Sequence, residues 1–109
     1  MAYDKALAER LAKIIASRSG MREKRMFGGI CYMLNGNMCV GIHKDNVIVR
    51  IGEDTAEKIM MEPHVKPMDI TGKVMKGWAI IGPDGITKDK SLERFCSFAI
   101  EFVLTLPPK

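Results

Sequence analysis

Cys31, Cys39 and His43 are the side chains whose spacing comes closest to a metal site, since all three lie within thirteen residues. Thiolates and imidazoles are the ligands that zinc prefers. The Asn35-Gly36 pair between the cysteines is typical of a two-residue hairpin turn, and its register directs Cys31 and Cys39 to opposite faces of a sheet. His43 shares a face with Cys39 but lies about 13 Å from it along an extended strand at ~3.3 Å per residue. We therefore expect no metal and no disulfide, and interpret the cysteines as buried thiols.

Enzyme chemistry has equally little support in the motifs. The two histidines, His43 and His64, lie in a hairpin and in a proline-flanked loop, and neither belongs to a nucleophile–base arrangement. The sequence contains none of the motifs GxSxG, GxGxxG and HExxH, nor a Walker loop. Gly28-Gly29 indicates a bulge or kink rather than a phosphate cradle. We expect a protein that is not an enzyme and needs no cofactor.

Basic residues gather near the N-terminal third of the chain, where Arg18, Arg22, Lys24 and Arg25 are opposed only by Glu23. The whole chain carries 17 basic and 13 acidic side chains, a formal charge of +4. A dedicated nucleic-acid surface usually adds interleaved aromatic residues, so we interpret this cluster as a solvated loop. Nucleic acid is accordingly a less favoured partner than protein.

The N-terminus is charged from Asp4 onward and has no apolar segment of a secretory signal, which predicts a cytoplasmic protein. Crossing a bilayer needs roughly 20 apolar residues in a row, and the longest runs here are short pieces. We therefore expect no membrane partner. Nine methionines fill core gaps in the simpler interpretation, and form an adaptable partner-binding surface in the alternative one.

A chain of 109 residues makes one domain, residues 1–109, with a core that needs no metal or disulfide. Apolar periodicity predicts the elements that must hold the candidate groups: a helix over residues 3–17, three or four strands over 25–51, a helix over 53–61, a hairpin over 67–70 and 74–81, and a helix from Asp89 to Leu106. This order of one helix, four strands, one helix, two strands and one helix predicts an α+β fold with helices packed on an antiparallel sheet.

The hairpin register also predicts the two faces of the sheet. A second turn at Asp45-Asn46 would give a core face of Cys31, Met33, Met38, Val40, Ile42, Val47, Val49 and Ile51. The opposite face would carry Ile30, Tyr32, Leu34, Asn37, Cys39, Gly41, His43, Ile48 and Arg50. Because Ile30, Tyr32, Leu34 and Ile48 would expose a large apolar patch there, we expect a homodimer that covers it.

The residues 25–38, Arg-Met-Phe-Gly-Gly-Ile-Cys-Tyr-Met-Leu-Asn-Gly-Asn-Met, resemble the signature of the N-terminal domain of the TfoX/Sxy family. Val47-Ile48-Val49-Arg50, Pro67-Met68 and Met75-Lys76-Gly77-Trp78 extend the resemblance in the same order and spacing, so that it covers Tyr3 to Pro107. It implies a fold similar to secretion chaperones. Longer family members regulate competence genes with the cyclic-AMP receptor protein and carry a second, helical domain. This chain ends at Lys109, so we do not expect their full transcriptional role.

The resemblance implies a non-enzymatic protein-interaction or regulatory module, with a regulatory protein as its partner. The alternative is a small ligand- or nucleic-acid-binding domain that uses a basic and aromatic cluster. The candidate binding residues are Arg25, Phe27, Gly28, Gly29, Arg50, Lys76 and Trp78. Convergence of the charged and aromatic members in one pocket would favour a ligand, whereas burial of Arg50 against a carboxylate such as Asp69 would make that arginine structural.

Overall fold

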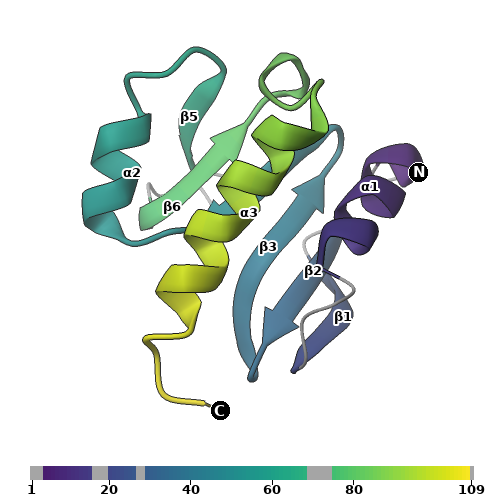
Figure 1. Ribbon diagram of the computed structural model, residues 1–109, viewed down its shortest axis with the longest axis vertical. Coiled ribbons are helices and arrows are strands. Elements are labelled where there is room, and N and C mark those ends of the chain that lie inside the picture. The colour runs from purple at the N-terminus through teal and green to yellow at the C-terminus, as the bar shows by residue number, and fades with distance from the viewer. Residues whose placement is uncertain (1–3, 16–19, 27–28, 69–74, 109) are drawn as a thin grey trace.

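The computed structural model describes residues 4–15, 20–26, 29–68 and 75–108 (Figure 1). These residues form three α-helices, six strands and one short 3-10 turn. The elements are α1 (Lys5–Ile15), β1 (Met21–Met26), β2 (Gly29–Leu34), β3 (Asn37–His43), β4 (Asn46–Arg50), α2 (Glu53–Ile59), β5 (Val65–Met68), β6 (Met75–Ile81), η1 (Pro83–Gly85) and α3 (Asp89–Val103). Within this part of the chain, no helix is long and apolar enough to cross a membrane.

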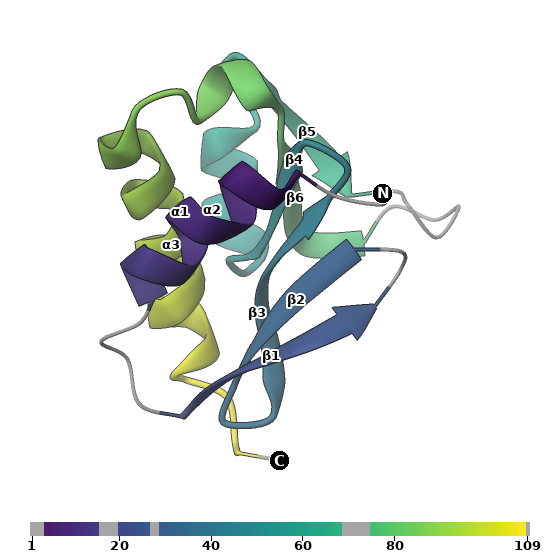
Figure 2. The ribbon, with the colours of Figure 1, turned by 90° about the vertical axis from the view of Figure 1, so that its right-hand side faces the viewer.

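One sheet holds all six strands, in the order β1-β2-β3-β4-β6-β5 with every neighbouring pair antiparallel. The three helices lie together on one side of it (Figure 2). Helix α3 packs along β3 and β4, and α2 packs beside β6. The α+β class predicted from the sequence is therefore confirmed.

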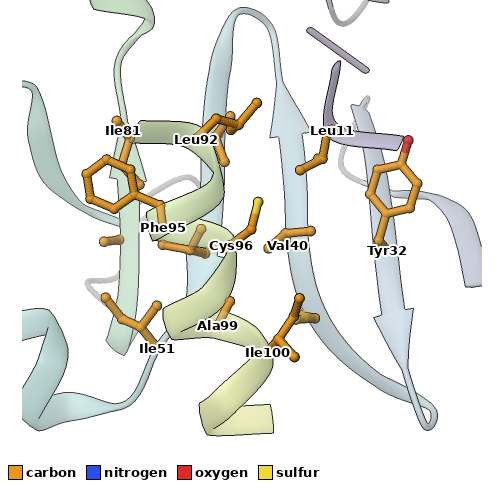
Figure 3. Close-up of a cluster of buried hydrophobic side chains, with 14 of the residues drawn as sticks. Leu11, Tyr32, Val40, Ile51, Ile81, Leu92, Phe95, Cys96, Ala99 and Ile100 are labelled. Carbon is orange, nitrogen blue, oxygen red and sulfur yellow. The ribbon is translucent and has the colours of Figure 1, made fainter. Parts of the chain in front are cut away.

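The core lies between the helices and the sheet. Leu7, Leu11 and Ile15 recur at helical spacing and are the buried residues of α1. Helix α3 buries Leu92, Phe95, Cys96, Ala99, Ile100 and Val103 in the same way. Figure 3 shows Phe95, Cys96 and Ala99 directed towards the sheet, where Cys96 lies beside Val40. The predicted core positions Val40, Ile42, Val47, Val49 and Ile51 are all 2% exposed or less.

A β-bulge at Cys39 overturns part of the predicted register between β2 and β3. The pairs Leu34↔Asn37 and Met33↔Met38 next to the turn are confirmed, but Tyr32 then pairs with Val40 instead of Cys39. The extra residue shifts the pairing by one, so Tyr32 lies opposite Val40, a residue of the core face. Ile30 and Leu34 are two residues away from Tyr32 and share its face. Ile30, Tyr32 and Leu34 therefore belong to the helix-covered core. Cys31, Met33 and Met38 lie on the other face, so their assignment to the core face was wrong.

The face away from the helices carries a second, smaller apolar cluster, which we call the outer cluster. Its buried members are Cys31, Met38, Ile48, Met68 and Ile80, and half-buried Met33, Met75 and Trp78 pack against them. The apolar patch on which the homodimer prediction was based does not exist, because three of its four residues face the helices. Tyr32, for example, is only 5% exposed. Dimerisation itself remains a prediction.

Two local expectations also need correction. The turn between β3 and β4 is Lys44-Asp45 rather than Asp45-Asn46, because His43 pairs with Asn46 and Lys44 takes a φ of 58°. The pairing changes by an even number of residues, so the predicted face of β4 is preserved. The basic segment predicted as a loop forms β1, with Arg22, Lys24 and Arg25 exposed on it, and Arg18 lies outside the described residues.

Candidate binding cleft

Lys76 and Trp78 line a cleft of about 270 Å³ between α2 and the first half of β6. Figure 1 shows α2 beside β5 and β6 at this end of the sheet. The apolar part of the lining is Ala56, Met60, Pro67, Met75 and Trp78, and the charged part is Glu53, Glu57 and Lys76. All three charged side chains are exposed. We call this feature the Trp78 cleft.

Gly77 fixes the distance between the two walls of the cleft. Its φ is +83°, a conformation that side chains with a Cβ rarely adopt. Its carbonyl oxygen accepts hydrogen bonds from the backbone N–H groups of Ile51 at 2.9 Å and Gly52 at 3.0 Å. These bonds hold β6 against the junction between β4 and α2, and they bring the backbone of the Lys76–Trp78 segment next to the start of the helix.

Gly52 sets the position of the helical wall. It has a φ of +86°, and a Cβ there would lie 2.7 Å from the Phe102 ring of α3. Helix α2 begins at the next residue, Glu53, and buries Ala56 and Ile59 against the core. The missing side chain of Gly52 therefore lets α3 press against the start of α2.

Arg50 supports Trp78 from the neighbouring strand. The two residues are directly paired between β4 and β6, and the guanidinium carbon lies 5.3 Å from the centre of the indole ring. A cation over an indole face at this distance is attracted to it by about 0.5–1 kcal/mol at an exposed site. Arg50 thus stabilises the orientation of Trp78. The contact with Asp69 considered from the sequence lies outside the described residues.

The predicted binding residues do not all converge. Lys76 and Trp78 line the Trp78 cleft and Arg50 stacks on Trp78, but Arg25 lies on β1 at the opposite edge of the sheet. Gly29 is a packing requirement, because a Cβ there would collide with the carbonyl oxygen of Ile42. Phe27 and Gly28 lie outside the described residues.

Sequence reasoning missed the helical wall of the cleft, which consists of Glu53, Ala56, Glu57 and Met60. Their spacing of three and four residues puts them on one face of a helix. That signal was present in the sequence, but it does not show which strand the face meets.

The thiols have the properties of structural cysteines. All three are buried, and burial raises the pKa of Cys31. Burial, followed by the neighbouring Cys39 and Glu93, raises the pKa of Cys96 to about 12. A thiol with so high a pKa stays protonated at neutral pH and is a poor nucleophile. In the part of the chain that the structure describes, no group of three or more His, Cys, Asp or Glu residues could hold a metal ion.

Comparison with known proteins gives a single line of evidence. No curated protein and no solved structure matches the sequence. A family profile described as the TfoX N-terminal domain matches residues 13–103, a segment that includes both walls of the Trp78 cleft and the strands beside it. The chain therefore belongs to the family of the TfoX N-terminal domain.

Proposed function

We propose that this chain is a non-catalytic protein-interaction module of a regulatory system, and that the Trp78 cleft takes an apolar side chain of its partner. The observation that carries the proposal is the lining of the cleft. Trp78 together with Met60 and Met75 supplies the residue types that are enriched where proteins meet other proteins. Membership of the TfoX N-terminal domain family supports a regulatory setting similar to that of competence regulators.

The charges of the cleft favour a protein over a nucleic acid. Two exposed carboxylates, Glu53 and Glu57, line it with only one ammonium group, that of Lys76. Phosphate contacts supply most of the affinity for nucleic acid, and carboxylates repel phosphates. The guanidinium of Arg50 already stacks on Trp78. The basic and aromatic cluster considered from the sequence is therefore better suited to a cationic or neutral partner.

The size of the cleft favours a side chain over a whole metabolite. Its volume of about 270 Å³ is below the roughly 300–1,000 Å³ of most small-molecule sites. Its walls are also rigidly set, because Gly77 and Gly52 fix them through backbone geometry. A preformed pocket of this size suits one anchor residue of a protein partner.

The test places a photo-crosslinking residue at Lys76 in cells, with Lys90 as the matched control. Both positions are exposed lysines, but Lys90 is at the start of α3 and is not part of the cleft lining. We expect a reproducible adduct with one protein at Lys76 and none at Lys90. The chain has one tryptophan, so titration of that partner must also change the fluorescence of Trp78.

Three results would contradict the proposal. Equal adducts at Lys76 and Lys90 would show non-specific contact. An adduct with nucleic acid alone would support the alternative of a nucleic-acid-binding domain. A purified partner that binds without any change in Trp78 fluorescence would place the interface away from the cleft.

A further inference from the structure

We infer that the free edge of β1 binds an extended acidic segment of a partner protein as an additional strand of the sheet. This inference is independent of the Trp78 cleft, because β1 and β6 lie in different halves of the sheet. Figure 2 shows β1 in front of the other strands, at the border of the sheet. The cleft takes an apolar side chain, whereas this edge binds through backbone N–H and C=O groups and through its positive charge.

The backbone of β1 is ready to pair on its outer side. Its six residues pair with β2 one by one, without a bulge, and the Asn35 N–H donates to the Gly20 carbonyl oxygen at 3.1 Å. Hydrogen-bonded pairs alternate in an antiparallel ladder. Counting from Gly20, the N–H and C=O groups of Met21, Glu23 and Arg25 therefore point away from β2. Within the described residues no element pairs with them.

The other edge of the sheet is a poorer site. Strand β5 has four residues, and its Pro67 has no N–H to donate. Its pairing with β6 is also irregular between Pro67 and Met68. Natural sheets block their edges with prolines, bulges and charged side chains, and of these devices β1 has only its charges.

Charge decides which segment fits. Arg22, Lys24 and Arg25 are exposed on β1 with a single carboxylate, Glu23. A second copy of the chain fits this edge less well, because it brings together two strands that each carry three cations and one carboxylate. Antiparallel pairing centred on Glu23 puts Glu23 opposite Glu23 and Arg22 opposite Lys24, and pairing centred on Lys24 puts Lys24 opposite Lys24 although Glu23 then meets Arg25. An acidic strand instead places its carboxylates opposite Arg22 and Lys24, which share the outer face of the sheet with Met33 and Cys31.

The helix side of β1 accepts the alternate side chains of such a strand. A hollow of about 250 Å³ lies there between α1 and the β1–β2 pair. Ala8, Ala12 and Ile30 provide its apolar lining, beside Lys5, Glu9, Glu23 and Tyr32. The best occupant is therefore a segment in which acidic residues alternate with apolar or β-branched ones.

The probe is the synthetic peptide Glu-Val-Asp-Val-Glu-Thr-Asp, and the control is the same peptide with lysine at every acidic position. The protein variants are Glu23→Pro and Glu23→Thr. Proline removes an N–H that points outward and leaves the bonds to β2 in place, whereas threonine keeps that N–H. We expect Glu23→Pro to bind about tenfold more weakly than Glu23→Thr, the effect of one lost backbone hydrogen bond.

Hydrogen exchange gives a second readout that does not depend on the proline variant. The amides of Met21, Glu23 and Arg25 must exchange more slowly when the acidic peptide is bound, while those of Arg22 and Lys24 change little. A peptide N-methylated on its pairing edge must lose binding to the unmodified protein. The comparison of the N-methylated peptide with the unmodified one tests the proposal even when the Glu23→Pro variant does not fold.

The proposal is overturned when the lysine peptide binds as well as the acidic one, or when no acidic peptide binds. It is also overturned when Glu23→Pro folds and binds like Glu23→Thr, because charge alone would then explain the contact. Displacement of the peptide by a short DNA duplex that protects no β1 amide would identify the edge as a phosphate-binding surface.

Discussion

The raised pKa of the buried Cys96 thiol predicts that the folded protein becomes less stable at alkaline pH. Its pKa is about 12 in the folded protein, against an ordinary value of 9.0. Above pH 9 the unfolded chain loses this proton while the folded chain keeps it. The contribution of Cys96 to the free energy of unfolding is therefore complete below pH 9 and is lost between pH 9 and 12. For one such group the free energy of unfolding falls by about 1.4 kcal/mol per pH unit.

Urea denaturation between pH 8 and 10.5 measures this slope, with Cys96→Ala as the comparison. The variant is less stable at pH 8 because it leaves a cavity in the core, but we expect its stability to fall less steeply. Parallel curves for the two proteins would mean that Cys96 ionises in the folded state at its ordinary pKa.

Gly52 and Gly77 allow backbone strain to be separated from steric collision. Both have positive φ, but a Cβ at Gly77 meets its neighbours at 3.4 Å or more, whereas one at Gly52 would strike the Phe102 ring at 2.7 Å. We expect Gly77→Ala to lower the free energy of unfolding by about 1–2 kcal/mol through backbone conformation alone. Gly52→Ala should lower it further, because it adds the collision with Phe102. Chemical denaturation of both variants measures this. In a Phe102→Ala background the two costs should become equal, and a difference that persists would contradict the steric explanation.

At the scale of elements, the helices were predictable and one strand register was not. Leu92, Phe95, Cys96 and Ala99 form a stripe with helical spacing, and a stripe of this kind has only one way to face a core. Strand β2 is apolar at almost every position because one side faces the helices and the other the outer cluster. Without alternation, nothing in the sequence shows that Cys39 forms a bulge.

The bulge can be tested by deleting Cys39. The remaining residues of β3 would then alternate regularly, with Met38 still in the outer cluster and Val40 still in the core. We expect the deletion variant to fold cooperatively. Its free energy of unfolding should fall by no more than the roughly 2–5 kcal/mol of a large-to-small core substitution. Circular dichroism and thermal unfolding provide the measurement. A variant that does not fold would show that the bulged residue itself is required.

The candidate site was predictable only in part, for a related reason. Lys76 and Trp78 stood out as a charged and an aromatic residue beside a glycine, and the structure places both in the cleft. Helix α2 faces them only because Gly77 bonds to the backbone of Ile51 and Gly52. That contact joins residues distant in sequence through backbone atoms, which leave no pattern in the side chains.

At the scale of the whole molecule, the two proposed surfaces lie in different halves of the sheet. Strands β2, β3 and β4 separate β1 from β6, and α3 braces the layer between them. Arg10 of α1 adds a tie to this frame, since it donates to the Ile86 carbonyl oxygen at 2.6 Å and pairs with Asp89. One partner could therefore occupy the Trp78 cleft while another extends the sheet at β1, an arrangement suited to a connecting regulatory module.

We still expect the chain to self-associate, but through a different surface from the one predicted from the sequence. Ile30, Tyr32 and Leu34 are covered by helices, so the apolar groups that a second copy can cover are the half-buried members of the outer cluster, Met33, Met75 and Trp78. Met33 is directly paired with Arg22, and a lysine at position 33 would add to the positive charge there. We expect Met33→Lys to weaken the dimer, whereas Met61→Lys, at a residue 90% exposed elsewhere, leaves it unchanged. Sedimentation at micromolar concentration measures the association, and a wild-type chain that stays monomeric throughout would show that the expected dimer does not form.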